Sequence, residues 1–466
     1  MKNNGSNLIK AGTAYVIGSF FSQGLRFLTL PLFSRLMSPA DYGYIASYEL
    51  WISILTTVIG IQTSATIANA YIDYGAERID KYTSSVSSVG VGTFGICVIV
   101  IITCGKLLSD VFELNTVVLI LGALQAIGFY FISMITAKYR MIDKVKNFLY
   151  FNIGCSTLCI LSAFACVYLS NDSKYLGYIL GFFIANFAIG IIAAGIIYFR
   201  GRAFINNDMV NYAVKLSSPL LLHSIASVIS SRINQILLLK MVDATNAGIY
   251  NFTNNFALII TGLYTAFNQA YVPWYYKQLH KGNSATVKLA SNIYISMFTL
   301  IVICIIMIMP ETIKIMGTKE YYYSMNIVPL LLFGTYINFL YTFPVNYEFY
   351  KKKTIYIAMG TVIAAICNIV LNIIMINSYG IIGASVATGV AAIILLTFHY
   401  IIAKNIIKEF ELGIVTFIKN ISIVLVFIII YYILMEKFII RIGIVIFIAV
   451  TFFYRALKLF NLLKGN

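Results

Sequence analysis

Long apolar segments recur along almost the whole chain, and their length constrains the fold more than any other feature. About 20 apolar residues are needed for a helix to cross a bilayer, and lipid-exposed backbone must hydrogen-bond within the chain. The sequence therefore predicts an all-α polytopic membrane protein with about 14 transmembrane helices of roughly 18 to 28 residues. The expected spans are 10–34, 43–70, 84–105, 115–137, 148–169, 175–199, 211–239, 247–273, 285–309, 322–347, 354–376, 380–403, 413–434 and 438–456.

The charge of the chain indicates its orientation in the membrane. Hydrophobic residues make up 60% of the sequence and charged residues 11%, with a formal net charge of +16. If the N-terminus is cytoplasmic, the cytoplasmic loops hold roughly three times as many Lys and Arg residues as the opposite loops, which the positive-inside rule favours. Both termini are therefore expected in the cytoplasm. The basic excess reflects topology, and no nucleic-acid partner is expected. The first span is too long for a signal peptide, so it should remain in the mature protein.

Nothing in the sequence indicates a metal, a cofactor or an enzyme. The seven cysteines lie within or at the ends of apolar spans. Cys155 and Cys159 share a helix face, but no His or carboxylate joins them at ligand spacing, so we interpret the cysteines as packing residues. The longest polar stretches, 71–83 and 200–215, are too short for a soluble domain, and the sequence shows no phosphate-binding glycine loop and no nucleotide motif.

An internal repeat with an offset of about 205 residues divides the chain. In the clearest match Arg35 aligns with Lys240, Asp41 with Asn246 and Gly43 with Gly248. Six helices separate the copies, so both halves enter the membrane from the same side, as in transporters built from parallel repeats. The matched pairs are 32–55 with 237–260, 141–154 with 349–360, and 174–187 with 378–390. The predicted domains are an N-terminal lobe of helices 1–6 (1–203), a C-terminal lobe of helices 7–12 (204–410), and helices 13–14 with a cytoplasmic tail (411–466).

Three motifs carry a resemblance to a known family. They are LTLPLFSRLMSPADYGYIASY from residue 28, SSRINQILLLKMVDATNAGIYN from residue 230 and YGIIGASVAT from residue 379. Over about residues 1–410 the chain resembles the polysaccharide biosynthesis and O-antigen flippases of the multidrug/oligosaccharidyl-lipid/polysaccharide exporter superfamily.

The resemblance implies a function and a location. Such proteins flip undecaprenyl-pyrophosphate-linked oligosaccharide repeat units across the bacterial cytoplasmic (inner) membrane by alternating access, for O-antigen or capsule assembly. It also implies membrane lipid, a proton or sodium gradient and a polysaccharide polymerase as partners. By analogy with lipid-flipping relatives, helices 13 and 14 would line a groove for the lipid tail. The alternatives are a multidrug or cation antiporter on the same fold and a non-transporting glycan-assembly scaffold.

Two arginines are the first candidates for contact with a diphosphate. Arg26 lies on a polar helix face with Tyr15 and Ser22, and Arg232 falls close to the equivalent position of the second repeat. An Arg within a span is costly unless it faces protein or water, and its guanidinium suits phosphate oxygens. The alternatives are that both arginines extend to the interface, or that Arg26 pairs with Glu49.

Glu49 and His223 are the candidates for ion coupling. Glu49 is the only carboxylate well inside the predicted spans, and its helix face continues through Ser53 and Thr56. A membrane-embedded acid suits proton or cation coupling, whereas the alternative is a structural pair with Arg26. His223 could titrate near neutrality, or it could be a hydrogen-bonded packing residue.

A stripe of amides and hydroxyls marks the eighth predicted span. These groups should face a cavity or another helix rather than lipid, so they are candidates for binding sugar hydroxyls or for hydrogen bonds between helices. The members taken as substrate-binding candidates are Asn251, Asn254, Thr261 and Asn268, with Thr265 on the same face.

Overall fold

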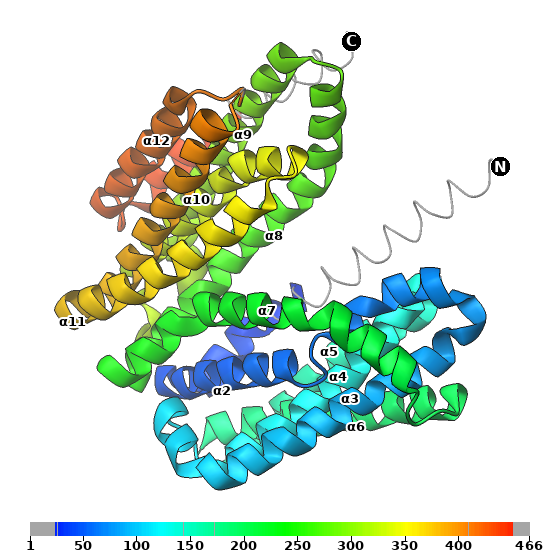
Figure 1. Ribbon diagram of the computed structural model, residues 1–466. Coiled ribbons are helices and arrows are strands. Elements are labelled where there is room, and N and C mark those ends of the chain that lie inside the picture. The colour runs from blue at the N-terminus through cyan, green and yellow to red at the C-terminus, as the bar shows by residue number, and fades with distance from the viewer. Residues whose placement is uncertain (1–23, 26, 143, 172, 409, 451–466) are drawn as a thin grey trace. The chain divides into compact units, whose positions relative to one another are not determined.

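The protein is helical throughout the part that its structure describes. The computed structural model in Figure 1 describes residues 24–450 except 26, 143, 172 and 409, and the regular structure of that part consists of helices. Eight of the helices in this part are long and apolar enough to cross a membrane, judged by length and composition. The prediction of an all-α polytopic membrane protein is confirmed. The chain divides into two compact units, Met1–Gly248 and Ile249–Asn466.

The first unit is built around α4 (Thr116–Met141). Helix α4 packs against α3, α5 and α6, while α7 packs against α2, α3 and η1. The sequence analysis placed α7 in the C-terminal lobe, and those lobe boundaries stay a prediction. The elements are a short helix at Phe27–Leu36, α2 (Pro39–Val58), η1 (Thr63–Thr66), α3 (Ile67–Phe112), α4 (Thr116–Met141), α5 (Val145–Leu169), α6 (Lys174–Gly201) and α7 (Asn207–Met241).

The segment predicted as one span over 43–70 is broken in the structure. Helix α2 ends at Val58, and Gly60, Ile61 and Gln62 follow with φ of 80°, 51° and 58°. The left-handed region costs a non-glycine residue about 1–2 kcal/mol, so an apolar composition gives no sign of such a turn. The polar stretch 71–83 was expected to be a loop between two spans. In the structure it lies inside α3, whose backbone is non-helical at Gly75.

The second unit packs around α10. Helix α10 contacts α9, α11 and α12, and α12 also contacts α9. Helix α11 is interrupted at Gly380 (φ 55°, ψ −134°), a conformation open mainly to glycine, and its two arms correspond to the predicted spans 354–376 and 380–403. The elements are α8 (Ala244–His280), α9 (Ser284–Met316), η2 (Lys319–Tyr321), α10 (Ser324–Tyr350), α11 (Thr354–Ile401), η3 (Ile402–Ile406), α12 (Ile414–Ile433) and a final apolar helix, Phe438–Val450.

Helices α2 and α8 begin in the same way, at positions matched by the sequence repeat. Asp41 of α2 donates its backbone N–H to the Ser38 hydroxyl at 3.3 Å and accepts the Ser38 N–H at 2.9 Å. In α8 the Asn246 N–H donates to the Asp243 carboxylate at 2.7 Å. Such side-chain acceptors satisfy the free N–H groups at a helix start.

The same two helix starts cross in close contact. A Cβ added to Gly43 would lie 2.1 Å from the carbonyl oxygen of Ala244, and one added to Gly248 would lie 1.6 Å from that of Pro39. In the sequence repeat, Pro39 corresponds to Ala244 and Gly43 to Gly248. The glycine of each helix therefore faces the carbonyl group at the equivalent position of the other helix. Only glycine allows the backbones to approach this closely.

We expect Gly248→Ala to destabilise the protein, because the added methyl group must push α2 and α8 apart. Overpacking of this kind costs about 1–3 kcal/mol. The matched control is Gly92→Ala on α3, where an added Cβ meets no atom within 4 Å. The thermal midpoint of the purified protein in detergent should fall for Gly248→Ala and not for the control. Equal midpoints would contradict the contact.

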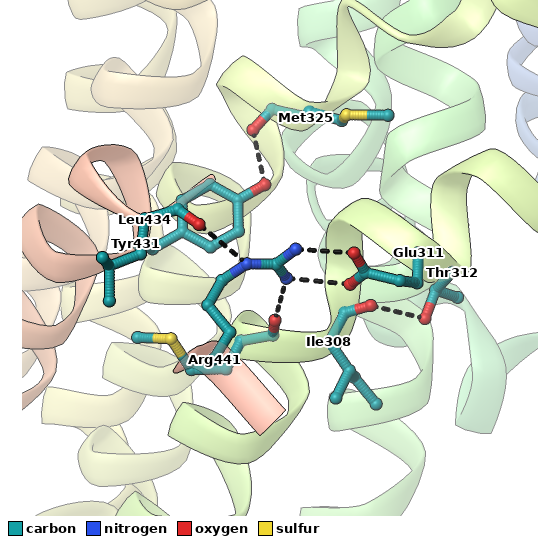
Figure 2. Close-up of polar contacts among 8 residues, drawn as sticks. Ile308, Glu311, Thr312, Met325, Tyr431, Leu434 and Arg441 are labelled. Atoms are coloured by element: carbon teal, nitrogen blue, oxygen red, sulfur yellow. Dashed lines mark hydrogen bonds and ion pairs between the residues drawn. The ribbon is translucent and has the colours of Figure 1, made fainter. Parts of the chain in front are cut away.

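Arg441 anchors the last described helix to α9. Figure 2 shows its guanidinium facing Glu311, with Nη1 and Nη2 donating to the two carboxylate oxygens at 2.8 and 2.6 Å. Its Nε donates to the Leu434 carbonyl at 2.9 Å. The Arg441 side chain is 1% exposed and that of Glu311 28%. This two-pronged geometry needs Arg rather than Lys.

We expect Arg441→Ala to lower the free energy of unfolding by about 3–5 kcal/mol, because it leaves the Glu311 carboxylate without its partner. Lys437→Ala is the control, since Lys437 is an exposed cation in the same segment. A double Arg441→Met, Glu311→Met variant should recover most of the loss, because it removes both charges. Thermal midpoints in detergent measure all three, and an Arg441→Ala midpoint equal to the control would rule out the anchor.

Candidate functional site

A polar cavity of about 400 Å³ lies within the first unit, between α2, α4, α6 and α7. It combines two charged side chains, two amides, several hydroxyls and aromatic rings. Two of its helices, α4 and α6, are long and apolar enough to cross a membrane, where such a set of polar groups is unusual. The lining residues are Tyr48, Glu49, Ile52, Ser53 and Thr56 of α2, Ile59 and Gln62 of the following turn, Ser64 of η1, Gln125, Phe129, Tyr130 and Ser133 of α4, Tyr178 and Phe182 of α6, and Arg232 of α7.

An ion pair between α2 and α7 forms one wall of the cavity. Arg232 Nη1 lies 2.6 Å from Glu49 Oε2, and the two side chains are 27% and 26% exposed. Both side chains also line the cavity, so the ion pair is accessible from it. An ion pair in this setting is strong enough to persist and open enough for another anion or cation to compete for it.

Hydrogen bonds hold the polar side chains of the wall in place. The Tyr48 hydroxyl donates to Gln125 Oε1 at 2.8 Å, which ties α2 to α4. The Ser53 hydroxyl donates to the Glu49 carbonyl at 2.6 Å. These bonds fix the directions of the amide and hydroxyl groups before any ligand arrives.

Two glycines make room for the Tyr130 ring. A Cβ on Gly60 or on Gly90 would each come within 2.0 Å of ring atoms of Tyr130, so the ring lies between the two backbones. The Tyr130 hydroxyl pairs with Thr63 Oγ1 at 2.9 Å and donates to the Val86 carbonyl at 3.2 Å. This arrangement makes the inner end of the cavity rigid.

The structure brings together two of the charged residues singled out from the sequence, Glu49 and Arg232. Ser53 and Thr56, predicted to share the Glu49 face, line the same cavity. The structure places Arg232 against the Glu49 carboxylate. The pairing of Glu49 with Arg26 that the sequence analysis weighed stays a prediction. Tyr15, Ser22 and Arg26 lie outside the described residues, as does the side chain of His223.

The predicted amide stripe lies on α8, in the second unit. There the Thr261 hydroxyl donates to the Ala257 carbonyl at 3.1 Å, and the Asn251 carbonyl accepts from the Asn255 side chain at 2.9 Å. Asn254 is half-buried, and Asn268 has a buried amide oxygen. The role of Asn251, Asn254, Thr261 and Asn268 in substrate binding stays a prediction.

One buried titratable pair was missed by the sequence analysis. His399 Nδ1 lies 2.8 and 3.0 Å from the two carboxylate oxygens of Glu348, and both side chains are 0% exposed. The predicted span ended at residue 347, one position before Glu348. The two residues are also far apart along the chain, so no helical spacing could connect them.

A second ion pair was missed at the end of α4. Lys138 Nζ lies 2.6 Å from Asp80 Oδ1 of α3, and the Lys138 side chain is 1% exposed. Both residues fall just outside or between predicted spans, where a charge is ordinarily assigned to a loop. As for metals, no three His, Cys, Asp or Glu side chains gather as a site within the described ranges.

Known proteins share this fold at low sequence identity. The chain is 19% identical to a solved structure titled lipid II flippase MurJ in an inward closed conformation, with a TM-score of 0.73 over 97% of this chain and 100% of that one. An inward-facing multidrug resistance transporter of the MATE family gives a TM-score of 0.64 at 12% identity, over 83% and 96%. At these identities the likeness concerns the fold.

Sequence comparisons identify the family. A protein of the Lsg locus of Haemophilus influenzae is 21% identical over 77% of this chain and 89% of its own length. A membrane protein of the same organism is 20% identical over 77% and 88%. The family described as Polysaccharide biosynthesis protein matches residues 8–279, more than half of the chain. The chain is thus a multi-pass membrane protein that belongs to the polysaccharide biosynthesis protein family.

Proposed function

We propose that this protein is a secondary transporter that flips undecaprenyl-pyrophosphate-linked oligosaccharide units from the cytoplasmic to the outer leaflet of the bacterial inner membrane. Its family and the fold it shares with a lipid II flippase support a lipid-linked cargo. The observation that carries the proposal is the cavity with Arg232 and Glu49 on its wall, because it offers a cation and fixed hydrogen-bonding groups among membrane helices.

Each part of the cargo has a counterpart in the cavity. The Arg232 guanidinium would bind diphosphate oxygens through charge-assisted hydrogen bonds. The Gln125 amide and the hydroxyls of Ser53 and Thr56 would bind sugar hydroxyls, and the ring of Tyr178 would pack against a sugar face. A cavity of about 400 Å³ holds part of an oligosaccharide head group while the polyprenyl tail stays in lipid.

The ion pair suggests how transport is coupled. A diphosphate that binds Arg232 must compete with Glu49, and a proton or cation on Glu49 would release the guanidinium. Loading and release of the cargo would then be tied to occupancy of Glu49, with alternating access of the cavity to the two membrane faces. Both termini would lie in the cytoplasm, and Arg26 and His223 remain candidates for the same pathway.

A cation antiporter is the second candidate, because the chain also shares its fold with multidrug MATE transporters. A cationic drug would need a carboxylate available in the cavity. The Glu49 carboxylate lies 2.6 Å from Arg232, so a drug would have to displace an arginine held in place by the protein. This contact favours an anionic cargo.

We expect Arg232→Ala to reduce glycan export about ten- to a hundredfold, because charge-assisted hydrogen bonds contribute about 1.5–3 kcal/mol. Arg232→Lys should restore export in part. The charge-swapped variant Arg232→Glu, Glu49→Arg should regain the thermal midpoint but not export. Surface glycan measured at matched protein levels distinguishes these cases. If the swapped variant exports normally, the pair is structural and does not bind the diphosphate.

Deletion of the gene in the source organism tests the function itself. Surface glycan should disappear, and undecaprenyl-pyrophosphate-linked units should accumulate on the cytoplasmic leaflet, where an enzyme added outside cannot reach them. The wild-type gene should reverse both effects, and the Arg232→Ala variant should not. Intact surface glycan together with new sensitivity to cationic dyes would instead establish the antiporter.

A further inference from the structure

A second cavity, of about 600 Å³, lies in the second unit at the C-terminal ends of α8 and α10. None of its residues belongs to the site proposed above. Helix α10 is long and apolar enough to cross a membrane and ends at Tyr350, so the cavity lies at the end of a candidate span. The lining residues are Tyr276, Lys277, His280 and Lys281 from α8 and the residue after it, and Phe349, Tyr350 and Lys352 from α10 and its following turn.

The polar part of this cavity is basic. Three of its lining residues are lysines and a fourth is His280, while no carboxylate lines it. Lys277 and Lys281 lie four residues apart, a spacing at which like charges on a helix repel. Among the described residues, no carboxylate pairs with these three lysines, Lys277, Lys281 and Lys352.

Two neighbouring lysines in the turn after α10, Lys351 and Lys352, have different surroundings. Lys352 lines the cavity and has a left-handed backbone, with φ of 57°. Lys351 instead places its ammonium 5.5 Å from the centre of the Tyr347 ring. Burial raises the pKa of Glu411, and Lys351 offsets part of that rise. Glu411 also accepts a hydrogen bond from Tyr275 at 3.2 Å. Glu411 is therefore engaged with Tyr275 and Lys351, whereas Lys352 lines the cavity.

Aromatic rings make up the rest of the lining. The rings of Tyr276 and Tyr350 lie 5.5 Å apart, and Phe349 is 49% exposed. A free inorganic anion would use the lysines and leave these rings in contact with water. Aromatic and basic residues together at a helix end are typical of contact with lipid head groups at the membrane surface.

We propose that this cavity binds the phosphate groups of an anionic lipid, with the lysines on the phosphate oxygens and the rings against the adjoining glycerol, sugar or first chain carbons. The positive-inside rule explains why lysines lie on one side of the membrane, but it does not explain why three of them line the same cavity. The lipid is either a phospholipid or a polyprenyl diphosphate, and the second source rests on the function proposed above.

Binding by the full-length purified chain in phosphatidylcholine nanodiscs tests the proposal. The probes are cardiolipin, undecaprenyl diphosphate and free inorganic pyrophosphate, with affinities measured by native mass spectrometry after extraction and by competition with a fluorescent lipid. The variant is Lys277→Gln, Lys281→Gln, Lys352→Gln. The control, Lys144→Gln, Lys146→Gln, Lys215→Gln, removes three exposed lysines expected on the same side. These exposed positions should leave folding intact, which size-exclusion profiles check.

We expect the cavity variant to weaken binding of at least one of the two lipids tenfold or more, and the control to weaken it less than twofold. Loss of cardiolipin binding alone would identify a phospholipid site, and loss of undecaprenyl diphosphate binding would identify a loading site for the cargo. Equal effects of both variants, no effect of either, or equal affinity for free pyrophosphate and lipid would overturn the proposal. Each of these leaves the Arg232 export test unaffected, so the two proposals fail separately.

Discussion

A charge buried among packed helices must be neutralised within reach of its own side chain, and this requirement explains where several charged residues of this protein lie. Arg232 meets Glu49 and Arg441 meets Glu311, while the Glu348 carboxylate is hydrogen-bonded to His399. Each pair joins two different helices, so neutralising a charge also fixes a helix contact. A single substitution therefore affects electrostatics and packing together.

The pairs differ in exposure, and exposure separates structural roles from functional ones. Arg441 is 1% exposed and donates to both oxygens of the Glu311 carboxylate and to backbone carbonyls, so its donors are already occupied. Arg232 is 27% exposed and borders a cavity with hydroxyls and amides beside it. A charged ligand in the cavity can compete for the partly exposed Glu49–Arg232 pair, but not for the buried guanidinium of Arg441. That difference, more than the presence of arginine itself, makes the α2–α7 pair the candidate site.

Much of the fold follows from the sequence because membrane length is a simple constraint. The apolar segments predicted the helices, and the glycine at 380 fell at the predicted boundary between two of them. The turn at Ile61 and Gln62 could not be predicted, because residues that favour helices hold a left-handed backbone there. Glu49 and Arg232 could be singled out as charges within spans, but their partnership could not, since it depends on how α7 packs against α2. Glu348 was missed because span ends are known only to within a few residues.

The crossing of α2 and α8 bears on the origin of the chain. Gly43 contacts the residue that the repeat matches to Pro39, and Gly248 contacts Pro39 itself. A contact in which each side offers the same two positions to the other is the kind formed by identical subunits around a two-fold axis. A polypeptide of half this length could make the same contact with a second copy of itself. Outside this contact the two halves of the repeat differ, since the first carries Glu49 and the second carries the basic cavity at the ends of α8 and α10.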